Sequence, residues 1–211
     1  MQKLEIECRA GYFDRKELLT LRKLGTRLQG HPERFRLPGL ESTSGPLGSG
    51  LSQACGIALA HRMDNILNRF IYVIMGDGET DEGNVWEAAM LAGNNHLNKI
   101  IAIVDRNNIQ IDGPTEVVMP LENYKQKWEA FGWYVIEIDG NNIEDVIDAC
   151  AMGRAITEKP VLIIAYTIPG KGVDFMESDY HWHGTPPNQE QGLKALHELR
   201  TLGGKIRSEH E

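Results

Sequence analysis

Short apolar runs alternate along the chain with segments whose apolar positions recur at helical spacing. Four of the runs predict strands, over residues 70–75, 100–104, 134–138 and 161–166, and the first two are typical of strands buried on both faces. The intervening and final segments predict helices over residues 83–97, 123–131, 142–157 and 189–202. Strands that alternate with helices indicate right-handed βαβ units. The pattern therefore predicts an α/β fold with a parallel β-sheet flanked by helices.

The first part of the chain follows a different pattern. Leucines at helical spacing predict a helix over residues 14–28, and the proline- and glycine-rich residues 29–46 predict an ordered loop. A segment of small apolar residues that begins near Gly48 predicts a buried helix. Because no repeat, low-complexity stretch or linker divides the chain, we expect residues 1–211 to form a single domain.

Composition narrows the function classes. The 211 residues include 22 Lys and Arg against 30 Asp and Glu, a net charge of −8. This balance argues against nucleic acid or an anionic membrane as the main partner. An anionic small molecule stays compatible, because backbone N–H groups and a metal ion can hold it. The three cysteines lie far apart and no apolar run approaches bilayer length, which favours a reducing, cytoplasmic location.

Candidate chemistry lies where the first two predicted strands end. Gly76, Asp77, Gly78 and Glu79 follow the first strand, and Asn107 stands 30 residues after Asp77, beyond the second strand. In parallel sheets, ligands bind outside these strand ends, and carboxylate and amide oxygens suit Mg²⁺ or Ca²⁺. Each feature by itself could be an ordinary turn, with Asp77 as a helix cap. Together they predict a site for a metal ion and a diphosphate.

The same residues resemble a known family. The Gly-Asp-Gly turn followed by Asn107-Asn108 resembles the pattern of thiamine diphosphate enzymes. Four further motifs are similar to transketolase motifs: Gly30-His31-Pro32, Gly45-Pro46-Leu47-Gly48, residues 79–88 after the turn, and Gly170-Lys171-Gly172 with Trp182-His183-Gly184. The resemblance covers nearly the whole chain. It implies a thiamine-diphosphate-binding fold, specifically the diphosphate-binding domain of a transketolase.

The resemblance also implies roles for individual residues. The metal ligands would be Asp77, Asn107 and the carbonyl of Ile109. Contacts to the cofactor would come from Gly45, Leu47, Gly76, Gly78, Glu79, Asn107, Ile111, Lys171 and His183. Catalytic roles would fall to His31 at the sugar substrate, to His183 and to Glu82, which lies with Glu87 near a subunit interface. Read without the resemblance, His31 and Lys171 are loop residues and the two glutamates are solvated charges.

Two parts of the family pattern are absent from these residues. The pyrimidine-binding domain, with its cofactor-activating glutamate, would have to come from a partner chain, a C-terminal transketolase subunit. The family's upstream histidine segment is also missing, so the domain is expected to be N-terminally incomplete. Ser49 and Pro169 stand where the family usually has other residues. The implied assembly is a hetero-oligomer such as α2β2, acting on sugar phosphates.

The expected function is therefore that of an N-terminal transketolase subunit, which moves a two-carbon ketol unit between sugars, as in the pentose phosphate pathway. Three alternatives stay open. The chain could be the α subunit of a 2-oxo acid dehydrogenase, whose metal turn is similar. It could be a ketose-to-deoxysugar synthase. It could also be a truncated transketolase paralogue that binds cofactor or partner without turnover.

Overall fold

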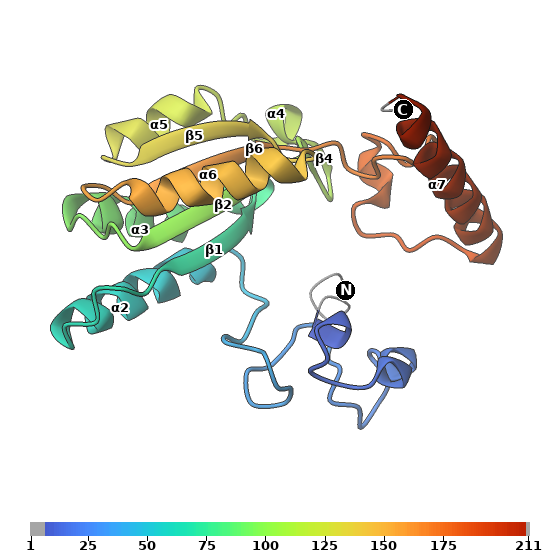
Figure 1. The fold of residues 1–211 in the computed structure, drawn as a ribbon, viewed down its shortest axis with the longest axis horizontal. Helices are drawn as coiled ribbons and strands as arrows, with labels where there is room; N and C mark the ends of the chain where they lie inside the picture. The colour runs from blue at the N-terminus through green and yellow to red at the C-terminus, as the bar shows by residue number, and fades with distance from the viewer. Residues whose placement is uncertain (1–6, 210–211) are drawn as a thin grey trace. The chain divides into compact units, whose positions relative to one another are not determined.

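The computed structural model describes residues 7–209 and has two compact units, and the chain passes from the first to the second between Leu47 and Gly48 (Figure 1). The first unit contains a small apolar centre, and the second contains the sheet and the helices around it. The prediction of a single domain over residues 1–211 stays a prediction.

Four parallel strands form the sheet, in the order β1-β2-β6-β5. Their bounds are β1 Ile71–Gly76, β2 Ile100–Arg106, β5 Tyr134–Asp139 and β6 Val161–Tyr166. In the pairing of β1 with β2, Gly76 lies opposite Asp105, so both strands end at the same edge of the sheet. The predicted parallel sheet is therefore confirmed, and so is the expected convergence of the two strand ends.

The helices predicted in the second unit are also present. The structure has α2 Ser49–Met63, α3 Gly83–Asn94, α5 Tyr124–Ala130, α6 Ile143–Ala155 and α7 Gln189–Glu209. Several elements too short to produce a periodic pattern were not predicted: the 3-10 helices η2 Gly78–Asp81 and η3 Tyr180–Trp182, the strand pair β3 Ile109–Gln110 and β4 Gly113–Pro114, and α4 Thr115–Val118. All of these short elements follow strand ends, where the candidate site residues lie.

Helices cover both faces of the sheet. Leu162 and Ile164 of β6 belong to a buried cluster that includes residues of α2, α3 and α5, whereas Val161 and Ile163 pack with residues of α6. This alternation follows from the two-residue period of a strand, which sends successive side chains to opposite faces. The two central strands, β2 and β6, are thereby largely buried between the helices.

The edge strand β1 differs from the sequence prediction. β1 was expected to be buried on both faces, but its Ile74 side chain is 76% exposed and its Tyr72 side chain is also exposed. The prediction is wrong for β1 because α6 packs over β5, β6 and β2. An apolar run does not predict whether its strand lies at the centre or at the edge of the sheet.

The predicted helix over residues 14–28 is also wrong. The structure has a single short 3-10 helix there, η1 Arg15–Thr20, and the chain then turns back. Arg22 and Gly25 have positive φ angles of 62° and 81°, and the Arg22 N–H donates to the Leu28 carbonyl at 2.9 Å. Leu28 is fully buried, whereas Leu24 is fully exposed. The leucines are spaced as on one side of a helix, but in the structure they belong to a short 3-10 helix and a loop that folds back on it. Residues 29–46 form the predicted irregular segment.

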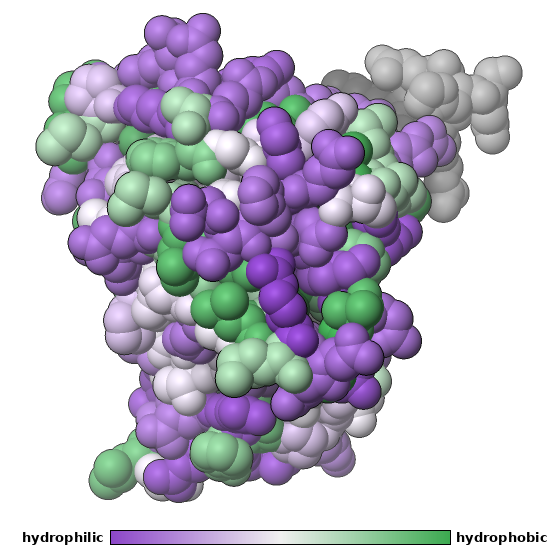
Figure 2. Space-filling view, turned by 90° about the vertical axis from the view of Figure 1, so that its left-hand side faces the viewer, coloured by the Kyte–Doolittle hydropathy of each residue, from purple (hydrophilic) through white to green (hydrophobic). Residues whose placement is uncertain are grey.

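The surface drawn in Figure 2 is mainly polar, with scattered apolar patches between the polar side chains. Within the part of the chain that the structure describes, no helix combines the length and apolarity needed to cross a bilayer.

Candidate cofactor and metal site

The turn after β1 holds a buried carboxylate at the edge of the sheet. Gly76 ends β1 and η2 begins at Gly78, so Asp77 occupies the turn between them. Asp77 is 1% exposed, and its Oδ1 accepts the Gly78 N–H at 2.8 Å. This bond satisfies a free N–H at the start of η2, as expected from the helix-cap interpretation of Asp77. The cap uses one acceptor position of one oxygen.

The other carboxylate oxygen of Asp77 is held by the chain beyond β2. Oδ2 accepts the Asn108 N–H at 2.8 Å, Nη1 of Arg106 at 3.0 Å and the Thr115 hydroxyl at 3.4 Å. Three donors therefore fix the orientation of the group and saturate Oδ2. Of the residues that the structure describes, only Gly78 donates to Oδ1. The carboxylate thus keeps spare acceptor capacity on a single, oriented oxygen.

The loop after β2 brings the second predicted ligand to the same edge. Nδ2 of Asn107 donates to Asp105 at 2.9 Å, and its Oδ1 accepts the Ile109 N–H at 3.0 Å. Asp105 also accepts the Thr167 hydroxyl after β6, so one carboxylate joins two strand ends. Since Asn108 contacts Asp77, the structure brings Asp77 and Asn107 to one edge, as the sequence predicted, and Ile109 follows in the same loop. Their metal-binding role stays a prediction.

The loop then forms the β3–β4 hairpin. Ile109 is buried, whereas Ile111 at the tip is 74% exposed. An exposed isoleucine beside a carboxylate site offers an apolar surface that a bound ring could cover. That arrangement is compatible with the cofactor contact that the family resemblance implies for Ile111.

Glu79 links the turn to the start of α2. Its Oε1 accepts the Gly48 N–H at 2.7 Å, and its Oε2 accepts the Gly76 N–H at 3.2 Å. The two oxygens thereby hold together the helix N-terminus after the Gly45-to-Leu47 loop and the end of β1. In the structure, Glu79 serves to position these backbones, and a direct contact to the cofactor stays a prediction.

Gly48 lies close to α3. A Cβ built on Gly48 would lie 2.0 Å from Oδ1 of Asn84, and Gly48 has a φ of 75°, so a larger residue would strain the backbone and displace the Asn84 side chain. Oδ1 of Asn84 is buried without a hydrogen-bond partner among the described residues. The motif therefore favours glycine, both for its left-handed φ and because the Asn84 side chain packs against this position. Glu82 is the N-cap residue of α3, and Glu87 lies farther along the same helix; both are exposed.

Arg106 is a buried residue of the candidate site that sequence reasoning did not single out. It is 2% exposed, donates to Asp77, and binds Glu116 at 2.6 Å and Glu122 at 3.1 Å. Burial opposes its charge, but the bonds to these carboxylates raise the pKa of Arg106 above its usual value. An arginine at the end of an apolar strand, beside two asparagines, was the available signal. Its partners lie 10 and 16 residues away and could not be inferred.

Asp81 is a second carboxylate near this turn. Burial raises the pKa of Asp81, its bond to Gln110 opposes the shift, and the charges of Asp77 and Glu116 add to it. Burial is the main cause of this shift in pKa, and the charge of Lys127 opposes those of the two carboxylates.

The first unit contains three of the predicted site residues. His31 is exposed, Gly45 is partly buried, and Leu47 is 58% exposed. A Cβ on Gly45 would lie 3.3 Å from Cγ of His31, and Gly45 has a φ of 142°. The structure thus brings His31 and Gly45 together across 14 residues of chain. Their predicted contacts to substrate and cofactor stay predictions.

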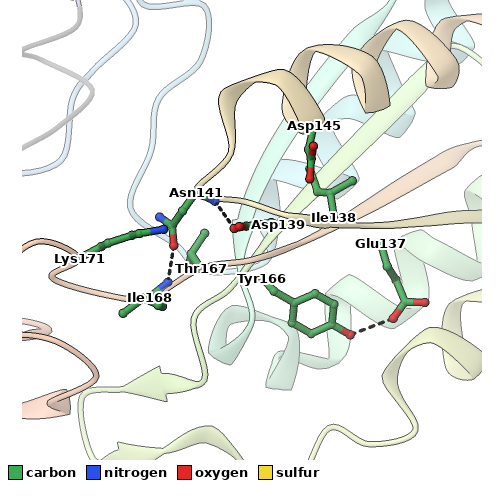
Figure 3. Close-up of a pocket in the computed structure, with 9 residues that line it drawn as sticks. All are labelled: Glu137, Ile138, Asp139, Asn141, Asp145, Tyr166, Thr167, Ile168 and Lys171. Carbon is green, nitrogen blue, oxygen red and sulfur yellow. Dashed lines mark hydrogen bonds between the residues drawn. The ribbon is translucent and has the colours of Figure 1, made fainter. Parts of the chain in front are cut away.

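The predicted residues after β6 lie on exposed loops. Lys171 lines an open pocket of about 560 Å³ at the ends of β5 and β6 (Figure 3). Acidic side chains, Asp139 among them, line the same pocket, and Figure 3 shows the Asn141 side chain linking its two walls by accepting the Ile168 N–H. His183 is exposed and directly follows η3, which packs against β4. No described bond joins either Lys171 or His183 to Asp77.

The donor set at the Asp77 edge fits a magnesium ion that is completed by a ligand. The described residues contain no cluster of three or more His, Cys, Asp or Glu side chains that could hold a metal ion. Mg²⁺, however, takes few protein carboxylates and completes its shell with amide or carbonyl oxygens, waters and phosphates. Oδ1 of Asp77, the Asn107 amide oxygen and the Ile109 carbonyl are donors of this kind. The residues therefore fit a metal bound together with a diphosphate.

Comparisons with known proteins agree with this chemistry. Residues 8–203 match the family described as transketolase, thiamine diphosphate binding domain. The chain is 44% identical over 193 residues to the 6-deoxy-6-sulfo-D-fructose transketolase subunit SqwG of a Clostridium species, covering 92% of this chain and 70% of that protein. It is 41% identical over 200 residues to one of the apulose-4-phosphate transketolase subunits of Phocaeicola vulgatus, covering 95% of this chain and 70% of that protein.

A solved structure is similar as well. The transketolase of Campylobacter jejuni matches with a TM-score of 0.81 and 36% identity, covering 87% of this chain and 30% of that one. The parallel sheet, the oriented Asp77 carboxylate and these matches lead to one assignment: the chain belongs to the transketolase family and contains the thiamine diphosphate binding domain of that family.

Proposed function

We propose that this chain is the N-terminal, diphosphate-binding subunit of a split transketolase, which transfers a two-carbon ketol unit between sugar phosphates together with a partner chain. One observation carries the proposal. Asp77 is buried, oriented by donors from two strand ends, and retains a free acceptor position next to a glycine turn. Two relatives that this chain covers to 70% of their length are named as transketolase subunits, which supports a two-chain enzyme.

In this proposal the described residues hold the cofactor's charged end. Asp77, Asn107 and the Ile109 carbonyl bind Mg²⁺, while the Gly78 backbone and His183 face the diphosphate. When bound, thiamine diphosphate supplies the carbon nucleophile that breaks and remakes the bond beside a ketose carbonyl. The chain's own part is to orient that group and to hold the cation that compensates its charge. His31 contacts the sugar.

The partner chain completes the site. It contributes the pyrimidine-binding domain and its glutamate, and the active site lies between the chains. Glu82 and Glu87 lie near that interface, and both are accessible in the isolated chain. The sugar donor and acceptor are not assigned, since the relatives named for sulfofructose and apulose-4-phosphate differ in their sugars.

Reconstitution tests the proposal. The full chain is combined with a pyrimidine-domain chain from the same organism, and ketol transfer is followed with a panel of ketose phosphates. Mg²⁺-dependent affinity for thiamine diphosphate is measured by calorimetry. We expect transfer by the pair, and we expect Asp77→Ala to weaken cofactor affinity by at least ~10-fold, since it removes a charged ligand.

Asp148→Ala on α6 is the matched control, because it removes an exposed carboxylate from another helix. Unchanged cofactor affinity in Asp77→Ala would contradict the metal assignment. Tight cofactor binding without transfer from any ketose phosphate would instead support the non-catalytic paralogue.

A further inference from the structure

Arg106 is the buried centre of a charge cluster that the cofactor assignment does not use, in which Asp77 is also buried and the side chains of Glu116 and Glu122 are partly exposed. It is the last residue of β2, and its side chain is 2% exposed. The guanidinium bonds to Asp77 through Nη1 and to Glu116 and Glu122 through Nη2. Arg106 therefore connects the turn at Asp77 (the metal turn) to residues 115–122. The two glutamates of that segment bind Arg106 and do not contact Asp77 directly.

The bond pattern divides the guanidinium between two tasks. Nη1 contacts Oδ2 of Asp77, the oxygen that also accepts Asn108 and Thr115, so Arg106 helps fix the carboxylate in place. Oδ1, with its spare acceptor capacity, lies on the other side of the group. Arg106 thus orients the predicted ligand without occupying the oxygen left for a cation.

The charge of Arg106 nevertheless works against a cation. A guanidinium 3.0 Å from the carboxylate repels Mg²⁺ and partly neutralises its ligand. Glu116 and Glu122 lie on the opposite nitrogen of the same guanidinium, at 2.6 and 3.1 Å. One positive charge is thereby shared among three negative ones. The negative charges of the two glutamates offset the positive charge of Arg106, so that Asp77 and these three side chains together keep a net negative charge.

We infer that Arg106 is a positioning residue for the metal turn and that Glu116 and Glu122 set the cation affinity of Asp77 by balancing the charge of Arg106. The inference rests on the proposed function, because it concerns the same metal site. In this inference, two glutamates that are not metal ligands affect metal binding, because both bind the buried Arg106 and Arg106 binds Asp77.

Glu116→Gln is a sharp test because it removes a charge and keeps an acceptor. Oε1 of Glu116 accepts both Nη2 of Arg106 and the Leu121 N–H at 3.1 Å, and an amide oxygen can accept the same bonds. The probe is Mn²⁺, whose dissociation constant is measured by electron paramagnetic resonance on the full chain with its partner chain and saturating thiamine diphosphate. We expect E116Q to weaken Mn²⁺ binding by roughly three- to tenfold.

Two further variants separate charge from structure. Glu116→Asp keeps the charge and should recover most of the lost affinity, which a purely structural role would not predict. Glu129→Gln removes an exposed carboxylate on α5 and should leave Mn²⁺ affinity within about twofold of the wild type. If E116Q does not fold, Glu122→Gln provides the same test on the second carboxylate.

The outcomes are distinct. Equal Mn²⁺ affinities in E116Q and E129Q, or an E116D as weak as E116Q, would overturn the inference and leave the proposed function intact. A wild-type complex whose cofactor binding does not depend on a divalent cation would overturn the metal assignment itself, and this inference with it.

Discussion

At the scale of single residues, Glu79 shows how a carboxylate can serve a site by holding backbone in place. Its two oxygens accept the N–H groups of Gly48 and Gly76, which belong to different elements. Without these bonds, the start of α2 and the end of β1 lose a direct connection. The family resemblance places Glu79 among the cofactor contacts. Glu79 thus also has a structural role, which requires no bound cofactor.

Glu79→Ala should therefore lower the free energy of unfolding by roughly 1–3 kcal/mol, since it leaves charge-assisted N–H donors without their acceptor. Urea denaturation measures this loss. Glu79→Gln keeps one acceptor oxygen and should fall between the alanine variant and the wild type. An alanine variant of unchanged stability but reduced thiamine diphosphate affinity would show that direct cofactor contact is the main role of Glu79.

Sequence reasoning found the residues whose chemistry is local. Gly76, Asp77, Gly78 and Asn107 were predicted to converge because parallel neighbouring strands end at one edge, and they do so. Arg106 was missed because its meaning depends on Glu116 and Glu122, which fold back onto it through a turn that has no periodic pattern.

At the scale of elements, the packing of α3 depends on one glycine near its end. A Cβ on Gly93 would lie 1.8 Å from the carbonyl oxygen of Phe131, just after α5. That distance is far inside van der Waals contact, and the neighbour is backbone, which cannot rotate away. The close approach of α3 to the α5–β5 connection therefore requires glycine.

We expect Gly93→Ala to destabilise the chain by about 1–3 kcal/mol or more, because the backbone must shift to accept the methyl group. Gly56→Ala in α2 is the matched control: no atom lies within 4 Å of its Cβ position. That change should be neutral or stabilising by up to ~1 kcal/mol, from helix propensity. Thermal unfolding compares the two. A Gly93→Ala variant as stable as Gly56→Ala would contradict the close approach.

Helix prediction succeeded and failed for one physical reason. The predicted helix near Gly48 and those around 83–97, 123–131 and 142–157 pack against the sheet, where the apolar side of each helix is buried. The leucines of residues 14–28 have the same spacing but no sheet within their unit. A turn at Arg22 and Gly25 instead buries Leu28, while Leu18 and Leu21 are partly buried and Leu24 is exposed.

At the scale of the whole molecule, acid stability depends on surface pairs as well as on the core. Glu137 of β5 binds Nζ of Lys125 at 2.7 Å and the Tyr166 hydroxyl at 2.9 Å, so it links α5 to two neighbouring strands. The bonds to Lys125 and Tyr166 hold the pKa of Glu137 below its usual value near 4.5, although burial opposes the shift. Burial, followed by the bond to Glu137, raises the pKa of Tyr166 to about 12.

A carboxyl group whose pKa is lowered on folding stabilises the protein above its unfolded pKa, and this contribution disappears as the pH falls through its folded pKa. Glu137→Gln should therefore be less stable than the wild type at pH 7, by ~1 kcal/mol or less for so exposed a pair. The difference should shrink as the pH falls below 4.5 and vanish once the pH lies below the folded pKa of Glu137. Unfolding midpoints across this range provide the check, and a difference that persists at low pH would show that packing is responsible.

The sequence by itself determined the alternation of strands and helices, the glycine-flanked carboxylate and its distance to Asn107, because these depend on neighbours in the chain and on period. The tertiary structure decided which strands lie at the edges of the sheet, how the Asp77 carboxylate is oriented, and that Arg106 joins it to Glu116 and Glu122. These features depend on contacts between distant segments. Such contacts form only when the sheet brings its strand ends together, so no local pattern encodes them.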